Sequence, residues 1–242
     1  MSNFEYFTAK VYNIIQETPK IRRFFIEFPE LETFEHKAGQ YIKINMPIEG
    51  KKTYRQYSIA SEPIGDNKIE LLIVQSEHGL GTEYLFNTVS IGSSLQVSSA
   101  LGRFLLPEKI DKDICFICTG VGLAPFRAMY QEIINKNLNP EKHNINLIFG
   151  TRAKEDLCYF EELTNIVENN DYFHYYPVLS RENPNEWTGK TGYVHQIYKE
   201  LYSNHIQAVF YICGWEVMIR EAKNTLKEMG YDKKQIHFEK YD

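Results

Sequence analysis

The 242-residue sequence lacks a long apolar run, an excess of basic residues and a secretory start. No stretch of about 18 consecutive apolar residues is present, which argues against a membrane-spanning helix. The net charge of −5 argues against a nucleic-acid-binding protein, because such proteins normally carry a clear positive excess. The first five residues are neither basic nor apolar in the manner of a signal peptide. We therefore expect a cytoplasmic protein without nucleic-acid or membrane partners.

Cysteine is also scarce, and the four cysteines are Cys115, Cys118, Cys158 and Cys213. Their spacing does not match an iron–sulfur ligand set, so such a centre would have to belong to a partner. Cys115 and Cys118 have the Cys-x-x-Cys spacing of redox and zinc sites, but they lie in the apolar run 114–118. Residues three apart in a strand point to opposite faces. We therefore predict buried structural cysteines and no metal site.

The composition, 43% hydrophobic and 24% charged, is typical of a globular protein. Up to about residue 107 the chain consists of short β-forming runs separated by turn residues, including Tyr41–Met46, Lys68–Gln75 and Ser94–Ser98. Short strands at this spacing indicate an antiparallel barrel or sandwich. We predict an antiparallel β-barrel domain over residues 1–108.

From residue 109 onward, apolar strands alternate with amphipathic helices. The run 114–118 is apolar throughout, as expected of a strand buried on both faces. Repeated β–α alternation implies a parallel sheet, so we predict an α/β nucleotide-binding domain over residues 109–242. The expected strands are Ile114–Cys118, Ile145–Phe149, Phe173–Leu179, Ala208–Ile212 and Gln235–Lys240, and the expected helices include Phe126–Ile134, Glu155–Glu168, Val194–Tyr202 and Met218–Met229.

Ligands of an open parallel sheet bind outside the carboxyl ends of its strands. After the first of these strands comes Thr119-Gly120-Val121-Gly122-Leu123-Ala124-Pro125. Glycines let a backbone approach a pyrophosphate, and the following helix offers free N–H groups and a positive dipole end. Pro125 suits a first helical turn but departs from the third glycine of the usual dinucleotide fingerprint. A plain tight turn is the alternative.

Two further strand ends bear on the choice of dinucleotide. The second strand ends in Gly150-Thr151-Arg152, without the carboxylate that normally holds the ribose of NAD(H). The third ends in Ser180-Arg181, a hydroxyl and a guanidinium that suit the 2′-phosphate of NADP(H), although a polar loop would look the same. At the fourth, Cys213-Gly214 leaves room for a flat ring, and a buried cysteine at a strand end is the alternative.

The predicted barrel carries two segments of chemical interest. In Arg55-Gln56-Tyr57-Ser58, a strand would send Arg55 and Tyr57 to one face and Gln56 and Ser58 to the other. This places a cation, an aromatic ring and a hydroxyl where a planar phosphorylated cofactor could use them. The segment Gly79-Leu80-Gly81-Thr82 opens a short helix, with Thr82 as a plausible cap, and is a second candidate phosphate cradle.

In their order and spacing these segments resemble the ferredoxin–NADP reductase superfamily. The resemblance extends through Gly39-Gln40-Tyr41, Arg55–Ser58, Gly79–Thr82, Gly102-Arg103-Phe104, Thr119–Pro125, Ser180-Arg181, Cys213-Gly214 and Glu239-Lys240-Tyr241. It implies an FAD-binding barrel and a nicotinamide domain. It also implies hydride transfer between NADPH and FAD, with single electrons passed to or from ferredoxin or flavodoxin.

The resemblance also implies roles for individual residues. In the barrel, Arg55 would contact the FAD pyrophosphate, Tyr57 would stack on the flavin ring, and Ser58 would bond near its N5. Gly79–Thr82 would cradle FAD phosphate, although serine is commoner than threonine at position 82. In the second domain, Thr119 and Gly120 would face the nicotinamide nucleotide, Cys213 would lie beside the transferring carbon, and Ser180 with Arg181 would select the 2′-phosphate.

The last residues match the Glu-x-Tyr ending of plant-type members, in which the tyrosine covers the flavin face that nicotinamide must occupy. Glu239 and Tyr241 match it, but Asp242 follows, and a closing edge strand without cofactor contact is the alternative. Candidate basic residues for docking an acidic carrier are Lys51-Lys52 and Arg22-Arg23. Alternative functions are an NAD(P)H:flavin reductase, the reductase component of an oxygenase, and a non-catalytic electron-transfer subunit.

Overall fold

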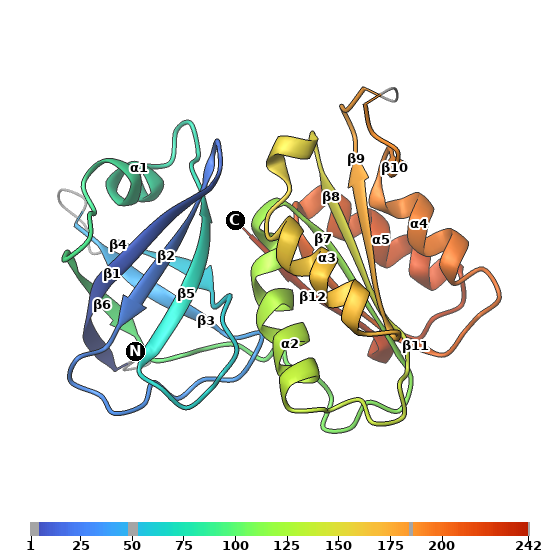
Figure 1. Ribbon diagram of the computed structural model, residues 1–242, viewed down its shortest axis with the longest axis horizontal. Coiled ribbons are helices and arrows are strands. Elements are labelled where there is room, and N and C mark those ends of the chain that lie inside the picture. Colours follow the sequence, from blue (N-terminus) through green and yellow to red (C-terminus); the bar gives the residue numbers. More distant parts are fainter. Residues whose placement is uncertain (1–4, 48–52, 184–185, 242) are drawn as a thin grey trace. The chain divides into compact units, whose positions relative to one another are not determined.

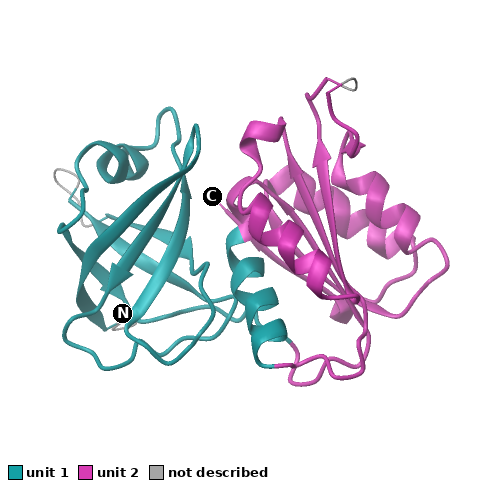
Figure 2. Ribbon diagram, viewed as in Figure 1, with its two compact units in different colours: residues 1–106, 124–136 teal, residues 107–123, 137–242 magenta. Residues whose placement is uncertain are grey.

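The computed structural model describes residues 5–47, 53–183 and 186–241, which form two compact units (Figure 1). Unit 1 comprises residues 1–106 and 124–136, and unit 2 comprises residues 107–123 and 137–242 (Figure 2). Over the described residues, every helix is too short or too polar to cross a bilayer.

Unit 1 is built on an antiparallel sheet whose six described strands have the order β4-β3-β6-β1-β2-β5. An isolated bridge between Ile59 and Leu71 joins the segment after β4 to β5, so the two edge strands meet. The predicted antiparallel barrel is therefore confirmed. Its strands are β1 (Tyr6–Thr18), β2 (Ile21–Glu27), β3 (Tyr41–Met46), β4 (Thr53–Ser58), β5 (Lys68–Val74) and β6 (Ser94–Ser98).

The barrel core is formed by alternate residues of the strands, as the two-residue period of a strand requires. On β5, for example, Ile69, Leu71 and Ile73 belong to the buried cluster. The hairpin of β1 and β2 was not predicted from the sequence. The pairing of these strands shifts register after Val11 and after Gln16, and such bulges interrupt the alternation that marks a strand.

Two helices belong to unit 1, α1 (Leu80–Asn87) and most of α2 (Leu123–Asn135). Helix α2 follows the first strand of the predicted α/β domain, but its contacts group it with the barrel. The rings of Phe126 and Phe104 lie 5.8 Å apart, and a Cβ at Gly39 would collide with Met129 of the helix. Residues 124–136 therefore group with unit 1 by their contacts, whereas the sequence predicted a single boundary at residue 108.

Unit 2 is built on a parallel sheet with the described strand order β10-β9-β8-β7-β11-β12, as predicted. Helices α4 and α5 pack on one face, where they share a buried cluster with β7 and β11. Its elements are β7 (Asp113–Thr119), η1 (Gly120–Gly122), β8 (Ile145–Thr151), η2 (Lys154–Asp156), α3 (Phe160–Asn169), β9 (Phe173–Leu179), β10 (Lys190–Thr191), α4 (Val194–Leu201), β11 (Ala208–Gly214), α5 (Glu216–Glu228), η3 (Lys233–Gln235) and β12 (Ile236–Lys240).

Helix α3 begins later than the helix expected at Glu155–Glu168. Residues Lys154–Asp156 form a 3₁₀ turn, and the helix starts only at Phe160. The residue between them, Tyr159, has φ +53°, a left-handed conformation that an α-helix cannot contain. The apolar spacing of this segment reflects burial rather than a continuous helix.

All four cysteines are free and buried, so the predicted buried state is confirmed. Cys115 belongs to the cluster shared with α4 and α5. Cys118 lies instead near Cys213 and Cys158, and burial raises the pKa of its thiol well above the usual range. The two sulfurs of the Cys-x-x-Cys sequence therefore serve the packing of different parts of unit 2.

Candidate functional site

The order of the strands in unit 2 marks one place as a binding site. The chain runs from β7 to β8 and β9 on one side of the sheet and then returns to β11 and β12 on the other side of β7. Ligands of open parallel sheets bind outside the carboxyl ends at such a reversal. The segments that follow β7 and β11, Thr119–Gly122 and Cys213-Gly214, are therefore brought together.

These two segments pack against each other with no room for side chains. A Cβ at Gly122 would collide with the carbonyl oxygen of Cys213, and a Cβ at Gly214 would collide with Oγ1 of Thr119. The Trp215 N–H also donates to Thr119 Oγ1 at 3.2 Å. Gly120 differs, since a Cβ there would meet no described atom within 4 Å and its φ is +54°. Gly122 and Gly214 therefore permit the close approach of the chain to itself, and Gly120 leaves open the side on which a phosphate could lie.

Three residues predicted for catalysis meet at this edge of unit 2. Cys213 pairs with Glu239 across β11 and β12. The Tyr241 hydroxyl lies 3.4 Å from the Val121 carbonyl, to which it donates. Burial raises the pKa of the Cys213 thiol, the charge of Glu239 raises it further, and a hydrogen bond with Tyr241 opposes the rise. A buried neutral thiol is a poor nucleophile, so Cys213 is suited to lie against a ligand rather than attack one.

The residues predicted to select the dinucleotide lie at the ends of β8 and β9. Ser180 Oγ donates to the Thr151 carbonyl at 3.2 Å, and the Arg181 N–H donates to the Arg152 carbonyl at 2.8 Å. The predicted hydroxyl and the two arginines are thus brought to one edge, where their side chains are exposed.

Glu182, which follows Arg181 directly, was not predicted as a site residue. Its carboxylate accepts from the Lys154 N–H at 2.7 Å and the Asn183 N–H at 3.1 Å. These backbone bonds lower its pKa. A carboxylate at this edge is the group that usually holds the ribose of NAD(H), and its place immediately after Ser180-Arg181 was a signal for it.

In unit 1, the two predicted phosphate-binding segments are in contact. A Cβ at Gly81 would lie 2.8 Å from Arg55 Cγ, so the arginine side chain lies across the first turn of α1. The Arg55 guanidinium donates to the Tyr54 carbonyl at 3.0 Å and is exposed. Arg55 and the N–H groups of α1 can therefore contact the same phosphate.

The rest of the Arg55–Ser58 motif also lies on β4, although Gln56 and Ser58, which were predicted to share one face, differ in exposure. Tyr57 is opposite Ile42 of β3 and packs against the barrel core, and its burial raises the pKa of its hydroxyl. Gln56 is opposite Lys43 and is exposed, whereas Ser58 is buried. An aromatic ring and a hydroxyl are thereby held in place next to Arg55.

Thr82 does not cap helix α1, so that prediction was wrong. The N-cap residue is Gly79, and no side chain among the described residues caps it. Thr82 lies inside the helix, where its hydroxyl accepts from the Ser76 N–H at 3.1 Å and donates to the Gly79 carbonyl at 3.0 Å. Thr82 therefore braces the loop that enters the helix. Leu80, the first helical residue, is exposed.

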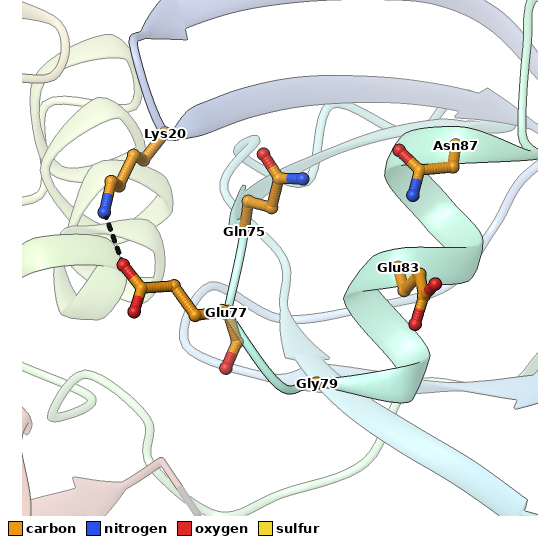
Figure 3. Close-up of a pocket in the computed structure, with 7 residues that line it drawn as sticks. Lys20, Gln75, Glu77, Gly79, Glu83 and Asn87 are labelled. Atoms are coloured by element: carbon orange, nitrogen blue, oxygen red, sulfur yellow. Dashed lines mark hydrogen bonds and ion pairs between the residues drawn. The ribbon is translucent and has the colours of Figure 1, made fainter.

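A pocket of about 490 Å³ opens beside this loop (Figure 3). Figure 3 shows Lys20 paired with Glu77, and Glu83 and Asn87 carried by α1. The Lys20 Nζ and Glu77 Oε1 atoms lie 2.9 Å apart. A volume of this size suits a nucleotide-sized ligand. The pocket is lined by Lys20, Gln75, Ser76, Glu77, Gly79, Glu83 and Asn87.

These residues fit FAD in unit 1. The first N–H groups of helix α1 have no acceptor within the helix, which suits a phosphate, and Arg55 supplies positive charge beside them. A bound flavin can accept a hydride and release electrons singly, and the protein supplies its binding and orientation. Arg55, Tyr57 and Ser58 would hold it.

The basic residues proposed for docking have other roles or lie outside the described residues. Arg22 donates to the Phe86 carbonyl at 2.9 Å and lies over the ring of Phe86. Arg23 is bonded to Glu70 at 2.6 Å. Both guanidinium groups thus stabilise the barrel itself. Lys51-Lys52 and the residue after Tyr241, Asp242, are not among the described residues.

Two family models match this chain. Residues 8–105 match an oxidoreductase FAD-binding domain, and residues 116–224 match an oxidoreductase NAD-binding domain. Together these matches include both predicted phosphate-binding regions of the barrel and the carboxyl edge of the parallel sheet.

Individual proteins resemble the chain over nearly its whole length. It is 29% identical over 249 residues to ferredoxin–NADP reductase B of Sorangium cellulosum, with all of both chains covered. It is 29% identical over 203 residues to an anthranilate 1,2-dioxygenase electron transfer component of Acinetobacter baylyi, covering 84% of this chain but 57% of that protein. A ferredoxin NADP⁺ reductase structure from Neisseria gonorrhoeae has a TM-score of 0.81 at 25% identity, covering 98% of this chain and 99% of that one.

A structure of an Amycolatopsis cytochrome P450 reductase has a TM-score of 0.88 at 25% identity, covering 98% of this chain and 70% of that one. The domain models, the full-length relative and the solved structures agree with the two folds and with the order of the motifs. The chain belongs to the ferredoxin–NADP reductase superfamily of flavin-dependent oxidoreductases.

Proposed function

We propose that this protein transfers a hydride between NADPH and tightly bound FAD and passes single electrons to or from ferredoxin or flavodoxin. The observation that carries the proposal is its correspondence, over all of both chains, to a ferredoxin–NADP reductase. Oxidoreductase FAD-binding and NAD-binding domain models match residues 8–105 and 116–224 of the chain, which supplies both domains that this reaction needs.

The proposed role of unit 1 is to hold FAD. Arg55 and the open start of α1 at Gly79–Thr82 bind the pyrophosphate, Tyr57 stacks on the flavin, and Ser58 bonds near N5. The contact of Arg55 with Gly81 and the pocket beside Gly79 support this assignment. They favour FAD over a smaller flavin, because a cradle for a second phosphate is present.

The proposed role of unit 2 is to bind the nicotinamide dinucleotide and present its reacting carbon. Thr119, Gly120 and Gly122 receive the phosphates, Cys213 and Gly214 lie beside the nicotinamide, and Glu239 with Tyr241 completes that edge. Correct placement of reactants can lower a barrier by roughly 7–11 kcal/mol, so holding the ring is the main contribution of these residues.

Preference for NADPH is proposed from Arg152, Ser180 and Arg181, whose positive charge and hydroxyl suit a 2′-phosphate. Glu182 beside them opposes this preference, because a carboxylate repels phosphate and suits a free ribose hydroxyl. The two arginines outweigh the one carboxylate, so we expect NADPH to be favoured while NADH still reacts.

The decisive experiment is steady-state kinetics of the purified, dialysed protein with NADPH and NADH. Ferredoxin, flavodoxin and free flavin are compared as acceptors. We expect a yellow protein that retains FAD and reduces a one-electron carrier protein faster than free flavin. Colourless protein that reduces free flavin best would instead assign it as a flavin reductase. Protein that reduces no acceptor, including an artificial one, would be a non-catalytic subunit.

A second function is favoured by other relatives, namely reduction of an oxygenase. The anthranilate 1,2-dioxygenase electron transfer component and the glycine betaine monooxygenase reductase subunit match this chain, which spans 57% and 63% of their lengths. Electron delivery to an oxygenase component in preference to ferredoxin and flavodoxin would support this function over the first.

A further inference from the structure

A cluster of buried and half-buried charges lies on the outer side of the barrel in unit 1. Glu70 points away from the core residues Ile69 and Leu71 that flank it on β5. Its carboxylate accepts two bonds from Arg23, at 2.6 and 3.2 Å, and one from Arg127 at 2.9 Å. Arg23 also pairs with Glu17 at 3.5 Å, so two arginines face two carboxylates.

The cluster also holds the segment that directly follows the flavin motif. The Ala60 N–H donates to the Glu70 carbonyl at 2.8 Å, and the Glu70 N–H donates to Ser61 Oγ at 3.0 Å. The Arg127 guanidinium donates to the Ala60 carbonyl at 3.0 Å. One nitrogen of Arg127 therefore bonds both to the carboxylate and to the chain two residues after Ser58.

Arg127 comes from helix α2, which begins directly after the dinucleotide-binding turn Gly120–Gly122. The same helix reaches the same barrel segment again at its last turn, where Asn135 donates to Glu62 at 2.5 Å. Arg127 therefore links helix α2, which follows the proposed dinucleotide-binding turn, to the chain that follows the proposed flavin-binding residues Tyr57 and Ser58.

Such a cluster contributes little net free energy to the stability of the fold. Glu70 and Arg127 are only 5% and 7% exposed. Removing two charges from water offsets most of their attraction, and apolar residues of similar size often stabilise a fold as well or better. What this guanidinium does provide is a fixed geometry, because the two N–H donors of one nitrogen lie in its rigid plane and reach both acceptors at once.

We propose that Glu70 and Arg127 are positioning residues for hydride transfer, holding helix α2 against the segment that follows Tyr57 and Ser58. The proposal rests on the proposed function. It assigns to these residues no contact with either cofactor. Loss of the clamp should therefore slow the reaction within the loaded enzyme more than it weakens the binding of FAD or dinucleotide.

The test is stopped-flow reduction of the FAD-loaded protein by saturating NADPH, with melting temperature and FAD content measured in parallel. Arg127→Met removes the clamp but leaves Glu70 paired with Arg23. We expect the limiting rate of flavin reduction to fall about 10- to 100-fold, as misplacement by about an ångström can cause. The dinucleotide Kd should change less than about twofold, and Arg127→Lys should recover part of the rate.

The matched control is Glu132→Gln, which breaks an ion pair at 2.8 Å between helix α2 and Lys136, the residue that follows it. In this variant, NADPH should reduce the bound FAD at the wild-type rate. If Arg127→Met fails to fold, Glu70→Gln and Arg127→Lys provide the same comparison. A lower melting temperature with an unchanged reduction rate overturns the inference alone. A wild-type flavin that neither dinucleotide reduces overturns the proposed function and the inference with it.

Discussion

The two units bring ligand-binding residues together by different physical means. In unit 2, the segments after β7 and β11 meet because neighbouring parallel strands end at the same edge, and glycines allow backbone to lie on backbone. In unit 1, Arg55 and Gly81 come from a strand and a helix, and a side chain makes the contact. A site formed by backbone in contact with backbone can adjust little to a substitution, whereas a site formed by a side chain can adopt another side-chain conformation.

Gly122→Ala, in the backbone site of unit 2, should have the largest effect on ligand binding. The new Cβ would collide with the Cys213 carbonyl, so the turn must move away from β11. We expect the apparent affinity for dinucleotide to fall by about 100-fold, as displacement of a bound group by about an ångström can cause. FAD content should be unchanged, which absorbance of the purified protein will check.

Gly120→Ala is the comparison for that prediction, measured as the melting temperature of the protein without dinucleotide. Its Cβ would enter the open side on which we propose that a phosphate lies, so the cost in the ligand-free protein is limited to a left-handed backbone of about 1 kcal/mol. Equal losses of melting temperature in Gly120→Ala and Gly122→Ala would contradict a collision with the Cys213 carbonyl as the cause.

Arg55→Ala should affect the other unit. Loss of a charge-assisted bond of roughly 1.5–3 kcal/mol lowers FAD affinity by about 10- to 100-fold. Arg55→Lys keeps the positive charge but not the planar guanidinium, so its FAD affinity should lie between those of the wild type and Arg55→Ala. Titration of the apoprotein with FAD measures this. Wild-type affinity in Arg55→Ala would remove Arg55 from the proposed phosphate site.

Tyr241→Ser tests the terminal tyrosine of unit 2. If the ring occupies the place that nicotinamide must take, its removal should tighten dinucleotide binding by about tenfold, or about 1.4 kcal/mol. Turnover should slow, because tighter binding of the ground state does not speed the reaction. Tyr241→Phe keeps the ring but loses the bond to Val121, and it separates the two contributions. Unchanged dinucleotide affinity in Tyr241→Ser would count against a covering ring.

Arg181→Gln should raise the KM for NADPH by about tenfold and leave that for NADH within about twofold, since only the former has a 2′-phosphate. Glu182→Gln should act in the opposite direction, because it removes a charge that repels phosphate. A parallel loss with both dinucleotides in Arg181→Gln would show that the arginine does not discriminate between them.

The smallest expected effect concerns His195, in the first turn of helix α4 in unit 2. Burial lowers its pKa below the usual 6.5, while an ion pair with Glu221 at 3.0 Å opposes the decrease. A lowered folded-state pKa contributes destabilisation only as the pH falls below about 6.5. NMR titration should show Glu221→Gln lowering the His195 pKa further. A higher pKa in that variant would contradict the assigned pair.

The fold was largely predictable, because strands buried on both faces are recognisable as apolar runs. The strands Tyr41–Met46 and Ser94–Ser98 and the parallel sheet of unit 2 followed from period and alternation. The hairpin of β1 and β2 did not, since bulges break its pattern. The start of α3 was missed because one left-handed residue, Tyr159, leaves no mark in an apolar spacing.

The candidate site was predictable where residues contribute characteristic side chains, and it was not predictable where they contribute only backbone groups. Cys213, Glu239 and Tyr241 were expected together, and strand register brings them to one edge. Val121 was not expected, since it contributes only a carbonyl. Glu182 was overlooked because the basic pair before it suggested a phosphate first.

The path of the chain through the two units has a consequence for dissecting the molecule. It enters unit 2 at Pro107, crosses to unit 1 at Ala124 for helix α2, and returns after Lys136. A gene fragment ending at residue 108 would encode a barrel without the helix that buries Glu70, and the complementary fragment would carry that helix unpaired. Neither half is therefore a portable module, and exchange of domains among related reductases would require a graft that includes residues 124–136.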